Sequence, residues 1–280
     1  MSYQVRVHAN KVVLIGVGGT GSLVLENLCR LLIGNDIPIY VVDPGRVKKR
    51  NIGRQAFYEG DIGKFKAQVA AERCSRLFHR KIAYCVQPFD GELIKESMDE
   101  GGEYRDRHFV ANALMIGCVD NPWARRSIDD AVSYQNWYLD AGNSFQLGQV
   151  LLGNVSAPTA MQRAFHKSTN VVEGLPMPSL QLPQLLTQGQ EVVVEDCAEA
   201  VDRGEQSPVI NQAMAMLVAN TVYRIINGTL DYMGAYINLE TGSLRYVPAE
   251  PSIVARMLNL KEEDLFAEEE QVQERIAIRV

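Results

Sequence analysis

A glycine-rich segment near the start of the chain has the residue types that bind phosphate. In the stretch VVLIGVGGTGS, an apolar run leads into four glycines, namely Gly16, Gly18, Gly19 and Gly21. Where a strand passes into a helix, glycines let backbone N–H groups approach phosphate oxygens, and the positive end of the helix dipole favours negative charge. Asp43 ends the next apolar run, where a carboxylate can accept hydrogen bonds from ribose hydroxyls. The spacing predicts a bound nucleotide, with a tight turn that binds nothing as the alternative.

The polar segment after Asp43 indicates which nucleotide is bound. The stretch DPGRVKKRNIGRQAF contains Asn51, Arg54 and Gln55, and the helix expected after it carries Lys66. An NAD-binding fold normally runs directly into its next helix here, whereas a triphosphate has more charge than a helix dipole can neutralise. Arg54 offers bidentate donors and Lys66 a compact point charge, while Asn51 can hydrogen-bond without charge. A solvated loop explains any one of these residues alone, but together they favour ATP.

Asp120 is the candidate metal ligand. It follows the apolar run in IGCVDN, at the carboxyl edge of the expected sheet, where open α/β folds bind their ligands. A carboxylate at this edge can hold Mg²⁺ against phosphate groups. The same residue precedes Pro122 closely enough to cap the next helix instead. The spacing leaves both roles open.

Alternating apolar and amphipathic runs place these residues on a doubly wound, Rossmann-like α/β fold with a mostly parallel sheet. Strands are expected at residues 12–16, 37–43, 82–86, 114–119 and 137–140. Helices are expected between them, at residues 20–32, 62–78, 92–99 and 122–134. We interpret residues 1–153 as the ATP-binding half of the molecule.

The second half has a different pattern. Strands at residues 149–152, 236–239 and 244–247, the last two joined by a hairpin turn at ETGS, are expected to add antiparallel strands to the sheet. The proline-containing stretch 156–195 is expected to be a structureless crossover loop, and a long helix is expected at residues 206–226. Residues 154–250 then complete the same domain. Residues 251–280 form an acidic tail, in which the stretch KEEDLFAEEEQVQER at residues 261–275 is interpreted as a solvated acidic helix that caps the domain or docks a partner.

The bulk composition limits the class of protein. A length of 280 residues is near the upper limit for one hydrophobic core. The formal net charge of −6 argues against a general nucleic-acid binder. No apolar run reaches the about 20 residues of a membrane helix, and the N-terminus lacks the apolar stretch of a signal peptide. We expect a cytoplasmic protein that binds neither nucleic acid nor membrane.

The motifs resemble those of the ThiF/MoeB and ubiquitin-activating superfamily. Its pattern of GxGGxG, DxDxVxxSNLNRQ, a lysine and DN is similar to Gly16–Gly21, Asp43–Gln55, Lys66 and Asp120–Asn121. The resemblance implies that Asp43 binds ribose, that Asn51, Arg54, Gln55 and Lys66 contact the nucleotide, and that Asp120 is the magnesium-site aspartate. It further implies ATP-dependent activation of the C-terminal glycine carboxylate of a ubiquitin-like protein, with release of pyrophosphate.

Other segments resemble the ThiF-like member of bacterial plasmid-type PRTRC cassettes. They are YLDAGNSFQLGQVLLG, CAEAVDRGEQSPVINQAMA and YINLETGSL. The resemblance thus covers most of the chain, and its relatives are commonly homodimers. The chain departs from the family at Gly45 and Arg50, which replace the second Asp and the Ser of the second motif, and it lacks the paired CxxC motifs of a structural zinc site.

Cys197 differs from the other four cysteines because acidic and small residues surround it in VEDCAEA, whereas the others lie in apolar runs. A thiolate there could accept the activated acyl group as a thioester. Its acidic neighbours should raise its pKa, which counts against that role and favours an ordinary loop or packing cysteine.

Two further functions remain open. The glycine turn and Asp43 alone are equally typical of an NAD-dependent oxidoreductase, although the four histidines lie outside any recognisable motif for proton transfer. A non-catalytic scaffold that keeps the fold and binds a nucleotide or a partner without turnover is the third possibility.

Overall fold

The centre of the fold is an eight-stranded sheet, whose strands lie in the order β11-β10-β7-β6-β5-β2-β3-β4. The computed structural model describes residues 2–90, 112–132, 136–187 and 207–266. Neighbouring strands are parallel from β4 to β6: β2 (Lys11–Ile15), β3 (Ile39–Val42), β4 (Ile82–Cys85), β5 (Ala113–Gly117) and β6 (Trp137–Asn143). The sheet continues in antiparallel fashion through β7 (Leu147–Gly153), β10 (Tyr232–Asn238) and β11 (Ser243–Pro248). The predicted α/β fold class, with antiparallel strands added by the second half, is confirmed.

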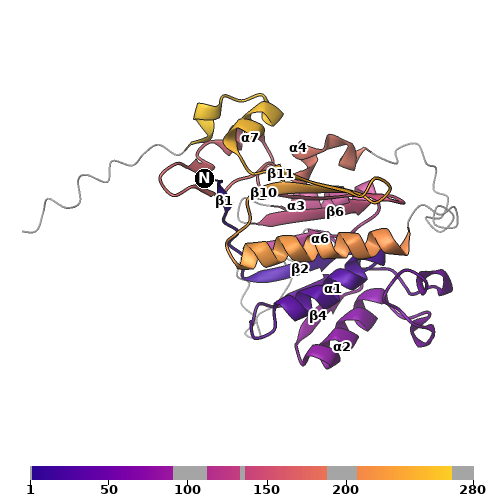
Figure 1. Cartoon of the computed structure of the whole chain (residues 1–280). Helices are drawn as coiled ribbons and strands as arrows, with labels where there is room; N and C mark the ends of the chain where they lie inside the picture. The colour runs from indigo at the N-terminus through magenta and orange to yellow at the C-terminus, as the bar shows by residue number, and fades with distance from the viewer. Residues whose placement is uncertain (1, 91–111, 133–135, 188–206, 267–280) are drawn as a thin grey trace, which may run out of the picture.

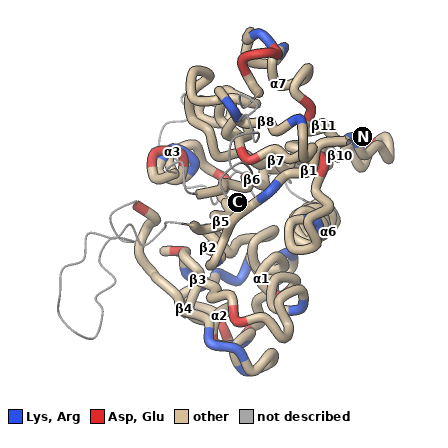
Figure 2. The backbone as a smooth tube through the Cα atoms, turned by 90° about the vertical axis from the view of Figure 1, so that its left-hand side faces the viewer, with Lys and Arg blue, Asp and Glu red and all other residues tan. Residues whose placement is uncertain are grey.

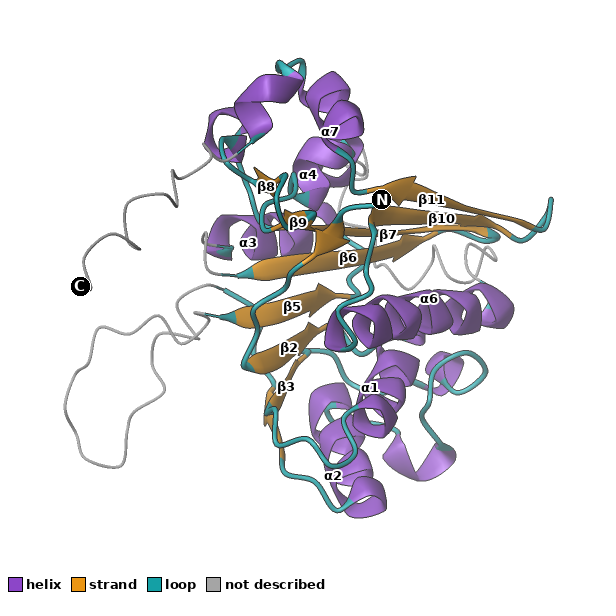
Figure 3. Ribbon diagram, turned by 60° about the vertical axis from the view of Figure 1, so that its left-hand side comes forward, coloured by secondary structure: helices purple, strands orange, loops and turns teal. Residues whose placement is uncertain are grey.

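Helices cover both faces of this sheet (Figure 3). Because side chains alternate along a strand, Val12 and Leu14 of β2 pack into one core cluster while Val13 and Ile15 pack into another. The first cluster includes residues of α1 (Gly19–Leu31), α2 (Lys66–Phe78) and α6 (Pro208–Ile226). The second includes Ile128 of α3 (Pro122–Ala131). Both faces of β2 are therefore buried, which explains why its residues are apolar without alternation.

The helix α6 lies beside α1 in space, although the two are far apart in the sequence (Figure 1). It begins at a Ser207 N-cap, whose hydroxyl accepts a hydrogen bond of 3.1 Å from the N–H of Ile210. By length and composition alone it could cross a membrane. Its residues Met214, Leu217 and Val218 are completely buried, as in the core helix of a globular protein.

The chain order reverses between β2 and β5. From β2 the chain moves outward through β3 and β4, and it then returns to β5 on the other side of β2. The loops that follow β2 and β5 therefore diverge at the carboxyl edge of the sheet, which is where open α/β folds bind ligands. Both the glycine segment and Asp120 lie in these two loops.

The predicted helix 62–78 begins later than expected. In the structure α2 starts at Lys66. Ahead of it stand the short 3-10 turn Glu59–Asp61 and Gly63, whose φ of +85° is incompatible with a right-handed helix. The expected helix at residues 92–99 lies outside the described residues.

The stretch 156–195 is not structureless over its described part, which corrects the prediction. It contains the 3-10 turns Pro158–Met161 and Pro183–Leu186, the short helix α4 (Pro178–Gln181), and the strands β8 (Phe165–His166) and β9 (Val171–Val172). With β1 (Gln4–Val5) these strands form a second, three-stranded sheet. Local periodicity could not reveal it, because β9 lies in the middle of the chain and pairs in parallel with β1, which lies near the N-terminus.

The expected acidic helix at residues 261–275 lies largely outside the described residues, and its described start, 261–266, contains a 3-10 turn and no α-helix. The helix α7 spans Pro251–Leu258 and ends at Asn259, which has left-handed backbone geometry with a φ of 54°. A 3-10 turn at Glu262–Leu265 follows, and Leu265 is completely buried in the main core cluster. Residues 251–266 thus pack onto the domain, and residues 267–280 lie outside the described part. Lysines, arginines and acidic residues are spread over several elements (Figure 2).

Candidate nucleotide-binding site

The glycine segment forms the turn between β2 and α1 as predicted. Gly16 has a φ of +86°, and a Cβ there would lie 2.6 Å from the carbonyl oxygen of Cys118 in the loop after β5. A Cβ on Gly21 would collide with the carbonyl oxygen of Gly16. Glycine is therefore required for the backbone path and for the close approach of helix to turn. In this described segment no side chain caps α1, so its first N–H groups face the turn.

Asp43 holds this turn in place. Its Oδ2 accepts a hydrogen bond of 2.7 Å from the N–H of Val17, and its Oδ1 accepts one of 2.7 Å from the N–H of Gly45. The side chain is buried. A carboxylate has about four acceptor positions, so two remain for ribose hydroxyls. The predicted ribose role is thus compatible with a second, structural role that spacing did not reveal.

The polar segment after Asp43 is an ordered loop. Asn51 is buried, and its Oδ1 accepts a hydrogen bond of 2.8 Å from the N–H of Lys48. The N–H of Ala56 donates to the Ser22 hydroxyl on α1 at 3.1 Å, and Arg73 on α2 donates to the carbonyl oxygen of Ala56 at 2.6 Å. These bonds tie the loop to both helices. A freely solvated loop, the alternative considered from sequence, does not fit this geometry.

Gln55 lies beside the glycine turn. Its Nε2 is 4.0 Å from the position that a Cβ on Gly18 would take. The side chain is buried, and its Oε1 has no hydrogen-bond partner in the described structure. A buried polar atom without a partner is costly and is often kept for a ligand. The residue therefore stays a candidate for nucleotide contact.

The charged candidates form one electrostatic cluster. Burial lowers the pKa of Lys66 below its ordinary value of 10.5, and the carboxylates of Asp43 and Asp120 oppose that change. Burial also lowers the pKa of Arg54, again opposed by Asp120. Side chains from two loops and from the first turn of α2 thus act on one another at the carboxyl edge of the sheet. The cluster has both the cations that a triphosphate needs and an acidic group for a cation.

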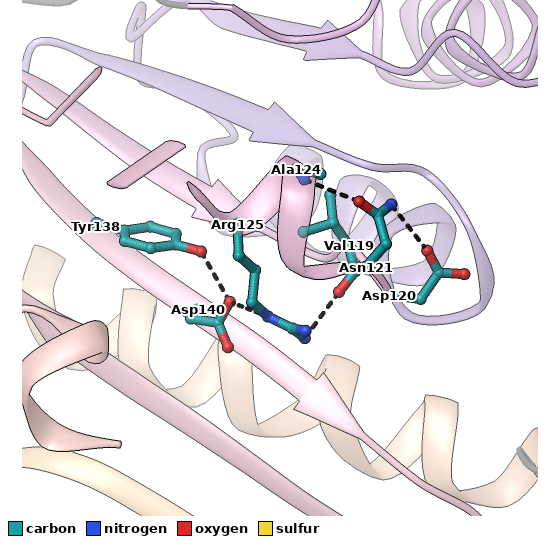
Figure 4. A network of polar contacts seen from close by, with 7 residues as sticks. All are labelled: Val119, Asp120, Asn121, Ala124, Arg125, Tyr138 and Asp140. Atoms are coloured by element: carbon teal, nitrogen blue, oxygen red, sulfur yellow. Dashed lines mark hydrogen bonds and ion pairs between the residues drawn. The ribbon is translucent and has the colours of Figure 1, made fainter. Parts of the chain in front are cut away.

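Asp120 does not cap the following helix. Figure 4 shows that Asn121 takes that role, because its Oδ1 accepts a hydrogen bond of 2.8 Å from the N–H of Ala124. Asp120 is exposed, and its Oδ1 accepts a weak bond of 3.5 Å from Asn121. This carboxylate is therefore available to hold Mg²⁺. Within the described residues no three His, Cys, Asp or Glu side chains form a metal cluster, so Mg²⁺ there would take its other oxygen ligands from phosphate and water.

A buried ion pair that sequence analysis missed supports the Asp120 loop (Figure 4). Arg125 Nε lies 3.0 Å from Asp140 Oδ1, which also accepts a hydrogen bond of 2.8 Å from the Tyr138 hydroxyl. Arg125 donates a second bond of 2.8 Å to the carbonyl oxygen of Val119. Desolvation opposes the charge of Arg125, but the carboxylate of Asp140 raises its pKa. The network thus fixes the residue immediately before Asp120.

Gly45 and Arg50, the two residues that depart from the family pattern, have different surroundings in the structure. A Cβ on Gly45 would lie 2.8 Å from Asp43 Oδ1 and 3.5 Å from Lys66 Cδ, so a glycine leaves room for both side chains. The charge of Arg50 contributes to lowering the pKa of Arg54, which places a further cation near the cluster. Cys197 lies outside the described residues, and its role stays a prediction.

Known proteins share sequence similarity with this chain. The model of the ThiF family matches residues 1–259. Ubiquitin-like modifier-activating enzyme 5 of Drosophila mojavensis is 30% identical over 144 residues, which cover 48% of this chain and 34% of that protein. Adenylyltransferase and sulfurtransferase UBA4 of Yarrowia lipolytica is 25% identical over 130 residues, covering 46% and 30% respectively. The chain thus spans about a third of the length of these relatives.

Solved structures support the fold. The crystal structure of E. coli MccB aligns with a TM-score of 0.55 and 16% identity, covering 86% of this chain and 63% of that one. The crystal structure of PaaA aligns with a TM-score of 0.52 and 16% identity, covering 87% and 65%. At this level of identity the similarity concerns the arrangement of strands and helices alone.

Proposed function

The chain belongs to the ThiF family, and on this premise we propose that it is an adenylating enzyme that uses ATP and Mg²⁺. Its substrate is the C-terminal glycine carboxylate of a ubiquitin-like or sulfur-carrier-like protein. The names of the two relatives, a ubiquitin-like modifier-activating enzyme and an adenylyltransferase, support this substrate class.

One observation carries the proposal: Arg54, Lys66 and Asp120 interact electrostatically, and the loop that carries Asp120 contacts the glycine turn at Gly16. The start of α1 can neutralise part of one phosphate, whereas a triphosphate needs further cations. Arg54 and Lys66 provide them, and Asp120 provides a ligand for Mg²⁺. An NAD-dependent oxidoreductase would use the glycine turn and Asp43 but has no need of this cluster.

The reaction requires positioning and charge neutralisation more than acid–base catalysis. A carboxylate oxygen of the substrate attacks the α-phosphorus of ATP, and the bond from that phosphorus to the bridging oxygen of the β-phosphate breaks. Pyrophosphate leaves with the electron pair, and an acyl-adenylate remains. Arg54 and Lys66 would stabilise the charge that grows on the leaving group, as would Mg²⁺ held by Asp120. The attacking group is already ionised, so no general base is needed.

We further propose that the protein is a homodimer. The support is an apolar stripe on the outer face of α6, where Val209, Met216 and Tyr223 are 63%, 49% and 54% exposed. These residues are spaced by about two helical turns and share one face. Sedimentation velocity should give twice the mass of 31.2 kDa, and Met216→Glu should shift the protein to monomers.

Pyrophosphate exchange tests the activity. With MgATP and a candidate ubiquitin-like partner that ends in glycine, labelled pyrophosphate should enter ATP. Asp120→Ala should abolish the exchange, whereas the neighbouring Asn121→Ser keeps a helix-capping hydroxyl and should preserve it. Exchange that persists unchanged in Asp120→Ala contradicts the assigned role of Asp120. Intact-mass analysis of the same mixture would reveal an adenylate, or a thioester if Cys197 accepts the acyl group.

A further inference from the structure

A buried amide on α6 lies against the first residue of α1. Asn211 is completely buried, in the first turn of α6. A Cβ on Gly19 would lie 2.7 Å from its Cγ, and its Nδ2 would be closer still. The amide therefore packs directly on the glycine turn, on a different residue from the one that Gln55 approaches.

Hydrogen bonds to its oxygen fix the orientation of this amide. Asn211 Oδ1 accepts bonds of 3.5 Å from the Thr20 hydroxyl and from Asn143 Nδ2. The Thr20 hydroxyl has a single proton, which it also shares with Asn143 Oδ1, so Thr20 could face either atom of the amide. Asn143 Nδ2 decides the orientation, because it can only donate and its other proton goes to the carbonyl oxygen of Ser144, so the Asn211 atom that faces it must be the oxygen. The Nδ2 group consequently points toward Gly19.

That nitrogen has no hydrogen-bond partner in the described structure. A buried donor without a partner destabilises a protein, because it loses its bonds to water and gains nothing in return. Two helix N-termini, those of α1 and α6, converge around it, and both favour negative charge. Here the unpaired donor and the two helix ends point to the same class of ligand, an oxyanion.

We propose that Asn211 donates this N–H group to a phosphate oxygen of the nucleotide bound at the start of α1. The inference rests on the proposed function, because it takes ATP as the ligand. The contact requires the turn to shift when phosphate binds, and Gly18 and Gly19, which lack side chains, permit such a shift. Asn211 then supplies an uncharged contact opposite the cationic cluster of Arg54 and Lys66.

Calorimetry with MgATP tests the proposal. For Asn211→Ala we expect affinity to fall by about 10- to 100-fold, the range for a hydrogen bond to a charged group. Asn211→Asp keeps the shape but places a carboxylate where the donor stands, so its affinity should fall further. Thermal unfolding without nucleotide supplies the second readout. Thr20 and Asn143 each keep another bond, to one another and to the carbonyl oxygen of Ser144, so the Tm of Asn211→Ala should stay near that of the wild type.

Asn220 on the same helix is the matched control. Its Nδ2 is satisfied by the Tyr232 hydroxyl at 3.2 Å. Asn220→Ala should therefore lower the Tm and leave MgATP affinity unchanged. If Asn211→Ala binds MgATP as tightly as the wild type, or loses Tm as Asn220→Ala does, the inference is wrong while the proposed function stands. If the wild type itself binds no MgATP, the proposed function fails.

Discussion

The guanidinium of Arg125 and the carboxylate of Asp140 lie 3.0 Å apart, with side chains that are 10% and 0% exposed. A buried pair of this kind gives little net stability, because desolvating both charges offsets their attraction. The pair does determine geometry. Arg125 also binds the carbonyl oxygen of Val119, so the charge on β6 is linked through α3 to the loop that presents Asp120.

Removing one partner of this pair should be strongly destabilising. Asp140→Asn leaves the buried guanidinium without a counter-charge, and we expect the free energy of unfolding to fall by about 3–5 kcal/mol. Urea denaturation measures the change. Asp231→Asn is the control, because the Arg224–Asp231 pair is more exposed, at 36% and 39%, and should contribute about 1 kcal/mol or less. Equal losses in the two variants would contradict the structural role of Asp140.

Much of the site was predictable because strand ends converge at one edge of a parallel sheet. The glycine turn, Asp43, Lys66 and Asp120 follow from local motifs, and the structure brings them together. The second role of Asp43 did not follow, because its bond to Val17 depends on the register of β2 against β3.

Asp140 and Asn211 were missed for a different reason. Each is a completely buried polar residue in a largely apolar element, in WYLDAGN of β6 and PVINQAM of α6. Periodicity assigns such a residue to a core face but cannot name its partner. A buried polar residue needs a hydrogen-bond or charge partner, so an isolated one in a core strand or helix is itself a signal. The sequence therefore does indicate that Asp140 and Asn211 have polar partners, although it does not identify them.

The two hydrogen bonds of Asp43 predict the effect of Asp43→Asn. An amide has one oxygen, so either Val17 or Gly45 loses its acceptor and faces an NH₂ group instead. We expect a loss of about 1–3 kcal/mol in the free energy of unfolding, together with weaker nucleotide binding. Asp36→Asn, at an exposed position, should change neither. A variant of Asp43 with wild-type stability would show that the turn does not depend on this carboxylate.

Gly21 should tolerate no side chain. In Gly21→Ala the new methyl group would overlap the carbonyl oxygen of Gly16, so α1 must move away from the turn. We expect lower thermal stability and loss of MgATP binding in calorimetry. Gly60 has nothing within 4 Å of its Cβ position, and Gly60→Ala should be neutral or stabilising by about 0.4–1 kcal/mol. If both variants bind MgATP equally, the close approach at Gly21 does not matter for the site.

The lowered pKa of Lys66 predicts a pH dependence of nucleotide binding. Burial disfavours its charged form, so in the free protein the ammonium loses its proton at a lower pH than the ordinary 10.5. The affinity for MgATP should therefore fall as pH rises toward 10.5, since a neutral amine no longer attracts phosphate. The same shift makes the folded state bind fewer protons than the unfolded state, so the stability contributed by Lys66 rises with pH over this window.

The variant Lys66→Arg separates these effects. A guanidinium keeps its charge over this pH range, so the fall in affinity should be much smaller, although its different shape can weaken binding at neutral pH. Lys64→Arg, at an exposed neighbouring position, should leave the pH profile of the wild type unchanged. The measurement is calorimetric titration with MgATP of the wild type and both variants. The titrations run from neutral pH to about 10.5, because this range covers the window below the ordinary lysine pKa. An unchanged profile in Lys66→Arg would assign the pH dependence to another group and remove Lys66 from the phosphate site.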